Sequence, residues 1–245
     1  MTGNTKNRDL FYFYSFVVMA ILCLGGFVPT FYLRPVYHTD PLPIWMHFHG
    51  VIYTLWYLIG IVQAWLILKN KRVLHQELGV VAAIVAFSAF IITFVGVAYL
   101  IGTGGHATGG AKFSLILTTG FTLCIAVAIY YRRKTHLHRQ LMLIGTALLT
   151  IPGFDRLLRI IIQPSVPDFS TPDAQKIVLG CGAVYFAYML YREIKQFGRP
   201  TVSLPVGFAC IALGGFLGAS FGDTATWSAM VTSFGSADAP HHVPH

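Results

Sequence analysis

The stretch LGVVAAIVAFSAFIITFVGVAYLI, Leu78 to Ile101, decides the fold, because it is long, apolar and free of charged residues. A helix needs about 20 predominantly apolar residues to cross the hydrocarbon core of a bilayer. Inside that core the backbone N–H and C=O groups must be paired within the segment, which a helix achieves alone. We therefore predict a transmembrane helix over residues 77–101.

The rest of the chain repeats this pattern. Hydrophobic residues make up 55% of the sequence and charged residues only 11%, against roughly 25% charged residues in soluble domains. We predict an all-α, polytopic membrane protein with about seven transmembrane helices in a single domain, residues 1–245. The expected spans are 10–33, 43–68, 77–101, 112–131, 138–163, 175–197 and 202–221, and a flexible polar tail is expected over 233–245.

The net charge of +8 could suggest a nucleic-acid partner, but the placement of the basic residues argues against one. Positive charge gathers in the cytoplasmic loops of membrane proteins. With the N-terminus inside, the inner side holds twelve of the 17 Lys and Arg residues, namely Lys6, Arg8, Lys69, Lys71, Arg72, Arg132, Arg133, Lys134, Arg139, Arg192, Lys195 and Arg199. We expect the N-terminus inside, the C-terminus outside, membrane lipids as partners and no nucleic acid.

Two histidines stand at the head of the second span, in WMHFHG, Trp45 to Gly50. Residues two apart on a helix point in nearly opposite directions, so His47 and His49 cannot share one metal ion. The helical stripe through His49 continues through Tyr53, Trp56, Gly60 and Gln63, and a glutamine at that depth avoids lipid. We predict that His49 faces the bundle and that His47 lies at the headgroup level.

A second feature is a short internal repeat in the sequence. RVLHQELGVVAAIVA opens the third span and THLHRQLMLIGTALL opens the fifth, each with a basic loop followed by Leu-His-x-x-Leu. Spans two and three, and spans four and five, are therefore interpreted as two copies of one helical hairpin. This layout puts His75 and His138 at the inner helix ends. It puts His49 and His106 at the outer ends, where His106 lies in the glycine-rich loop GTGGHATGG.

One histidine pair in each leaflet resembles the arrangement in di-haem transmembrane cytochromes b, although here the histidines lie at the helix ends. The resemblance implies haem b with axial ligands from His75 and His138 and from His49 and His106. The segments HFHG, LHQELG and HRQLM also resemble those of uncharacterised bacterial multi-pass membrane proteins, and HRQLM is similar to a segment of small proteins associated with haem-copper oxidase assembly. These resemblances imply a bacterial inner membrane.

The fifth span carries a charged cluster in GFDRLLR, Gly153 to Arg159. Asp155 and Arg159 have the i,i+4 spacing of an ion pair. Charges inside a span are costly and mark functional sites by default. We expect Arg156 and Arg159 to lie at the depth of His49 and to bind an anionic group such as haem propionates, a lipid headgroup or a carboxylate. By contrast, His136 and His38 are interpreted as solvated loop residues.

Three functions remain open at this point. The first is a redox or haem-handling role, with haem b, in an electron-transfer complex. The second is a non-catalytic accessory subunit of a larger respiratory or photosynthetic complex, which the small-residue face of span three would contact through Gly79, Ala82, Ala86 and Thr93. The third is a metal-dependent membrane enzyme with His49, His106 and Asp155 as ligands. The sequence does not decide whether the protein is an enzyme.

Overall fold

The computed structural model describes residues 2–102 and 108–223. Helix is the regular structure throughout this part of the chain, and it contains no strand. The elements are α1 (Thr2–Gly26), the π-helical turn η1 (Val28–Tyr32), α2 (Arg34–Tyr37), α3 (Ile44–Leu68), α4 (Arg72–Gly102), α5 (Thr108–Tyr130), α6 (Thr135–Ile162), α7 (Thr171–Phe197) and α8 (Ser203–Asp223).

Six of these helices are long and apolar enough to cross a membrane, within α1, α3, α4, α5, α6 and α7. The chain is therefore an all-helical polytopic protein, as predicted. The predicted span 202–221 corresponds to α8, which runs alongside the others, although the apolar part of α8 within the described side chains, Ser203–Leu217, is shorter. The polar tail predicted over 233–245 lies outside the described residues.

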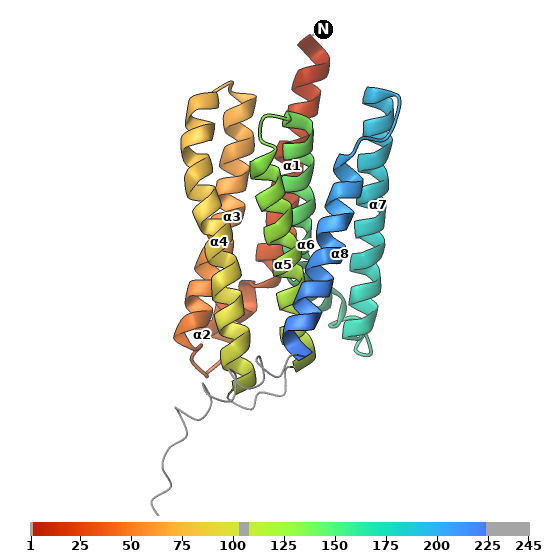
Figure 1. Cartoon of the computed structure of the whole chain (residues 1–245). Coiled ribbons are helices and arrows are strands. Elements are labelled where there is room, and N and C mark those ends of the chain that lie inside the picture. The colour runs from red at the N-terminus through yellow and green to blue at the C-terminus, as the bar shows by residue number, and fades with distance from the viewer. Residues whose placement is uncertain (1, 103–107, 224–245) are drawn as a thin grey trace, which may run out of the picture.

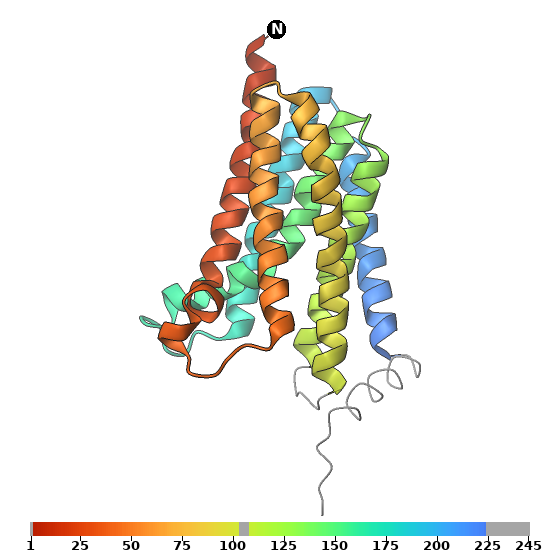
Figure 2. The same ribbon diagram turned by 90° about the vertical axis from the view of Figure 1, so that its left-hand side faces the viewer.

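The long helices run roughly along one axis (Figures 1 and 2). Neighbouring helices form a closed ring in the order α1, α3, α4, α5, α6 and back to α1. Helix α8 packs against α5 and α6 from outside this ring, and α7 packs against α6. The two predicted hairpins, α3–α4 and α5–α6, are thus adjacent units of the ring.

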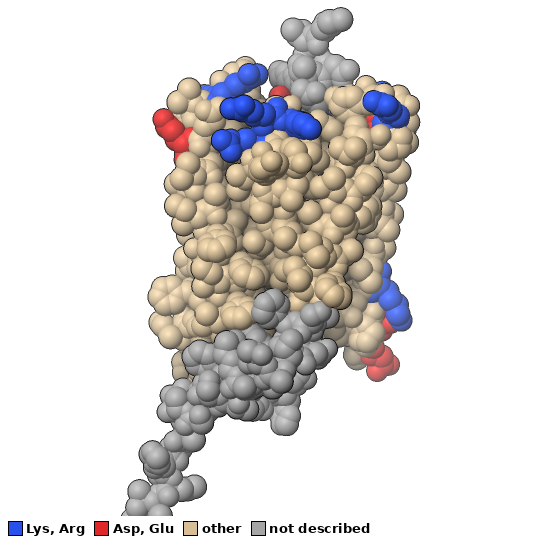
Figure 3. Space-filling model, in the orientation of Figure 1, with Lys and Arg blue, Asp and Glu red and all other residues tan. Residues whose placement is uncertain are grey.

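The two ends of the bundle differ in charge. The N-terminus and the connections α3–α4, α5–α6 and α7–α8 lie at the same end (Figure 1). On the face that Figure 3 shows, Lys and Arg gather at that end, above a broad band without charged side chains. We call it the basic end, and we call the other one the opposite end. An uncharged band between two charged rims is the surface that a bilayer requires.

The first span differs from its predicted form. The sequence predicted one helix over 10–33, with Pro29 inside it, whereas α1 ends at Gly26 and Pro29 lies in η1. Proline has no N–H and fixes its own φ, so a helix readily stops before it. By contrast, Pro152 lies inside α6 as predicted.

The end of α1 also crosses α6 at very short range. A Cβ atom on Gly26 would lie 1.9 Å from the carbonyl oxygen of Gly153, and one on Gly153 would lie 2.4 Å from the carbonyl oxygen of Cys23. Only glycine fits such an approach of two backbones. This crossing fixes the position of Asp155 and Arg156, which follow Gly153 on α6.

The core of the ring is aromatic and closely packed. Trp56 and Tyr57 of α3 and Phe121 of α5 are almost completely buried. The rings of Trp56 and Phe121 meet edge to face with centroids 4.9 Å apart, a favourable geometry for aromatic pairs. The small residues Ala82, Ala86, Ala89 and Thr93 of α4 are buried as well. The ring is thus filled by side chains.

Candidate functional sites at the two ends of the bundle

The basic end brings together His75 and His138, the histidines of the repeated Leu-His-x-x-Leu pattern. His75, in the first turn of α4, and His138, in the first turn of α6, have ring centroids 6.4 Å apart and planes at 89°. Their helices are not neighbours in the ring, so the two imidazoles meet across its interior. Both side chains are half-buried.

Each of these rings is held by the preceding helix of its own hairpin. His75 Nδ1 donates to the carbonyl oxygen of Gln63 on α3 at 3.3 Å, and His138 Nδ1 donates to that of Ala128 on α5 at 2.9 Å. A carbonyl only accepts, so Nδ1 carries the proton and the lone pair of the neutral ring lies on Nε2. The arrangement suits ligation of a metal or acceptance of a proton at Nε2.

At the opposite end, the two histidines of WMHFHG point apart. His47 is exposed and lies near the ring of Phe31, with centroids 6.1 Å apart. His49 is half-buried and stacks on Tyr53, with centroids 4.2 Å apart and planes within 18°. Its Nδ1 is buried and has no hydrogen-bond partner. The structure therefore bears out the predicted directions of the two side chains.

The stripe that continues from His49 faces the ring interior and bonds to threonines of three other helices. Tyr53 OH lies 2.8 Å from Thr93 Oγ1 and 3.0 Å from Thr118 Oγ1. Trp56 Nε1 donates to Thr146 Oγ1 at 3.3 Å, and Tyr57 OH lies 3.1 Å from Thr150 Oγ1. These bonds tie α3 to α4, α5 and α6. Gly60 and Gln63 are buried farther along the same stripe.

The charged cluster predicted on span five lies beside His49. Arg159 donates from Nη2 to Asp155 Oδ2 at 2.9 Å, which is the predicted i,i+4 pair. The guanidinium of Arg156 lies over the ring of Phe27 at 4.5 Å and close enough to His49 for their charges to interact. Cationic and hydrogen-bonding groups from α3 and α6 therefore meet where α1 ends, and such a set can bind an anion.

His106 lies outside the described residues, so the predicted outer pair of His49 and His106 stays a prediction. The same holds for the predicted metal site of His49, His106 and Asp155. Within the part of the chain that the structure describes, no three His, Cys, Asp or Glu side chains come close enough together to hold a metal ion.

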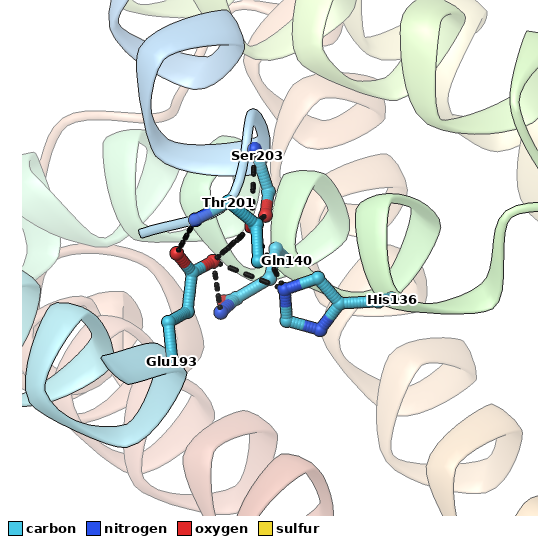
Figure 4. A network of polar contacts seen from close by, with 5 residues as sticks. All are labelled: His136, Gln140, Glu193, Thr201 and Ser203. Atoms are coloured by element: carbon cyan, nitrogen blue, oxygen red, sulfur yellow. Dashed lines mark hydrogen bonds and ion pairs between the residues drawn. The ribbon is translucent and has the colours of Figure 1, made fainter. Parts of the chain in front are cut away.

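Sequence reasoning missed a buried carboxylate at the basic end. The side chain of Glu193 on α7 is fully buried, and His136 Nε2 donates to its Oε1 at 3.1 Å (Figure 4). The interpretation of His136 as a solvated loop residue is therefore wrong, because His136 begins the first turn of α6 and packs against α7. The sequence signal for this burial is Met189, an apolar residue one helical turn before Glu193 and on the same face of α7.

Both oxygens of the Glu193 carboxylate accept hydrogen bonds. Oε1 also accepts from Gln140 Nε2 at 3.1 Å, Thr201 Oγ1 at 2.9 Å and Ser203 Oγ at 2.7 Å. The backbone N–H of Thr201 donates to Oε2 at 2.9 Å. Figure 4 shows these donors converging from α6, the α7–α8 connection and the start of α8. The network cross-links three helices through one buried carboxylate.

The small-residue face of α4 was expected to contact a partner subunit. Ala82, Ala86 and Thr93 are instead buried inside this chain, and Gly79 lies near Gln63 of α3. Small side chains allow α4 to approach α3 closely, and this packing within the chain buries the face.

No family model, curated protein or solved structure matched the chain.

Proposed function

We propose that the protein is a membrane-embedded redox or haem-handling protein in which His75 and His138 hold haem b at the basic end of the bundle. The observation that carries this proposal is the distance of 6.4 Å between the two ring centroids. Two imidazoles that bind one ion from opposite sides, at about 2.0–2.1 Å per nitrogen, have ring centres roughly 6–6.5 Å apart.

The number of protein ligands also favours haem over a bare metal ion. A structural metal site takes at least three or four protein ligands, whereas a porphyrin supplies four nitrogen ligands of its own and needs two axial ones. The described residues offer a pair of imidazoles here and no larger group of metal ligands. When bound, the haem would supply one-electron chemistry.

The residues around the pair would hold the axial ligands in place. The carbonyl oxygens of Gln63 and Ala128 fix the two rings through Nδ1 and direct the lone pairs to Nε2. Such bonds to the far nitrogen orient the ring and raise its basicity as a ligand. Arg139, which is ion-paired with Asp9, lies near both histidines.

The test is a visible spectrum of the full-length protein purified from membranes of a haem-producing host. Six-coordinate haem b is expected to give a sharp Soret band and, after reduction with dithionite, narrow α and β bands. His75→Ala and His138→Ala should each remove about one haem equivalent from the purified protein. His47→Ala is the matched control, because His47 is an exposed histidine with no described hydrogen bond, and it should keep the spectrum.

A colourless wild-type protein would contradict the haem proposal, as would haem retained in both inner variants. The accessory-subunit role in a larger membrane complex would then be the better hypothesis. Elemental analysis for a metal other than haem iron would test the hypothesis of a metal-dependent enzyme. Size-exclusion chromatography of each variant separates loss of haem from loss of the fold, since His75 and His138 also bond their hairpins.

A further inference from the structure

The cluster at the opposite end carries a positive charge that no described residue neutralises. Asp155 is paired with Arg159. Arg156 makes neither a hydrogen bond nor an ion pair with the part of the chain that the structure describes, and its contact is the face of Phe27. An aromatic face attracts a cation but does not neutralise it.

The polar atoms around Arg156 are also incompletely bonded. Asp155 is only 8% exposed, and its Oδ1 is buried without a partner. The Nε–H of Arg159 and the Nδ1 of His49 are buried without a partner as well. Buried polar atoms in folded proteins are nearly always bonded, and a set of unbonded atoms in one place needs an explanation. A bound ligand supplies one.

Packing contacts outside the cluster fix the elements that carry its polar groups. The contact of Gly26 with Gly153 fixes α1 against α6 less than one turn before Arg156. On α3, His49 is stacked on Tyr53, whose hydroxyl is in turn bonded to Thr93 and Thr118. The backbone that carries Arg156 and the ring of His49 are therefore both fixed by contacts outside the cluster.

The kinds of unbonded atoms define the ligand. Arg156 and the Arg159 Nε–H are donors and call for an oxyanion, whereas Asp155 Oδ1 accepts and calls for a hydroxyl. We propose that Arg156, Arg159, Asp155 and His49 bind an oxyanion that carries a neighbouring hydroxyl group. A phosphatidylglycerol headgroup and a free phosphate monoester such as glycerol phosphate share this chemistry. The site is independent of the haem proposal, because it uses other residues at the other end.

The experiment measures the midpoint of thermal unfolding of the full chain in phosphatidylcholine nanodiscs. One arm adds phosphatidylglycerol to the bilayer, and the other adds glycerol phosphate to the buffer. A ligand that binds the folded state raises the midpoint, and we expect a rise of at least about 2 °C in one of the arms. The arm that responds identifies whether the source is a lipid or a soluble anion.

Three variants test the assignment to this cluster. Arg156→Gln should lose the rise, and Arg156→Lys should keep part of it, because the charge remains while the planar set of donors is lost. Arg132→Gln, which removes an exposed arginine at the basic end, should respond like the wild type. A rise of equal size in Arg156→Gln and wild type would overturn the proposal, and so would no rise in either arm.

Discussion

Two buried polar clusters occupy the two ends of this bundle, and they differ in how well their atoms are bonded. At the basic end, the Glu193 carboxylate accepts five hydrogen bonds from four residues. At the opposite end, Asp155 accepts one bond and has a buried oxygen without a partner. Both carboxylates are buried on a membrane helix, where the charged form is costly.

The difference separates a structural role from a binding role. A carboxylate with partners on both oxygens holds its donors together and fixes the contacts among their helices. A partly bonded one beside an unpaired arginine keeps capacity for a ligand, and the protein bears the free-energy cost of that capacity. Burial of an acidic residue alone would not distinguish these roles, whereas the hydrogen bonds that its carboxylate oxygens accept do.

The largest expected effect concerns membrane topology, which sets the compartment that each end of the bundle faces. Because basic loops stay cytoplasmic, reporter fusions in the connections near residues 70, 133 and 200 should be active only as cytoplasmic reporters. A fusion near Asp168, between α6 and α7, should be active only as an external reporter. A cytoplasmic signal at Asp168 would reverse the assignment of the two ends.

The next largest effect is expected from removing the bonded carboxylate. Glu193→Ala leaves the donors of His136, Gln140, Thr201 and Ser203 without their acceptor, and should lower the free energy of unfolding by about 3–5 kcal/mol. Denaturant unfolding in detergent micelles measures this loss. Glu77→Ala, which removes an exposed acid of α4, is the control and should stay close to the wild type. A small loss for Glu193→Ala would mean that water replaces the carboxylate easily.

An intermediate effect is expected where α1 crosses α6. Gly153→Ala places a Cβ atom 2.4 Å from the Cys23 carbonyl oxygen, and separating the two backbones should cost about 1–3 kcal/mol. Gly180→Ala on α7 is the matched control, because nothing lies within 4 Å of its added Cβ, and it should be neutral or stabilising. The unfolding midpoints of the two variants give the comparison, and equal midpoints would argue against the close crossing.

A smaller effect is expected from the hydrogen bonds that join Tyr53 to Thr93 and Thr118, between the two ends of the bundle. Tyr53→Phe removes the bonds to Thr93 and Thr118 and should cost about 1 kcal/mol. The loss stays modest because Thr93 Oγ1 still donates to the Ala89 carbonyl oxygen at 2.8 Å. Chemical unfolding measures the change, with Tyr14→Phe on the exposed face of α1 as control. A loss of unfolding free energy as large as that of Glu193→Ala would show that the Tyr53 bonds stabilise the bundle as much as the Glu193 network does.

The smallest effect is expected within WMHFHG. His47→Ala removes an exposed side chain and should change the free energy of unfolding by less than about 0.5 kcal/mol. His49→Ala should change the response of the protein to phosphatidylglycerol or glycerol phosphate, because His49 borders the proposed anion site. Parallel melts of the two variants with and without these ligands measure both quantities. Equal loss of the response in both variants would contradict the opposite directions of the two histidines.

Local periodicity was enough to predict much of this structure. The apolar runs placed every long helix except α1 to within about five residues. The helical repeat assigned His49 to the interior and His47 to the surface. The spacing of Asp155 and Arg159 predicted their ion pair. Each of these inferences needs only the geometry of one helix.

Contacts between helices distant in the chain were beyond that reasoning. His136 and Glu193 are far apart in sequence, and no repeat within α6 or α7 indicates that their helices meet. The small residues of α4 were recognised as a packing face, but the sequence did not show that α3 of the same chain covers it. The close approach of Gly26 to Gly153 is again a contact between helices, and no pattern within α1 or α6 indicates it.

The bonds from His75 to the Gln63 carbonyl and from His138 to the Ala128 carbonyl have a consequence for biogenesis. Each bond lies wholly within one hairpin, so a hairpin that leaves the insertion machinery can satisfy its histidine before it meets the other hairpin. The two imidazoles come within 6.4 Å only when both hairpins have joined the ring. The histidine pair therefore forms late, as a product of assembly, and a cofactor held between the two rings would be acquired after the helices are in the membrane.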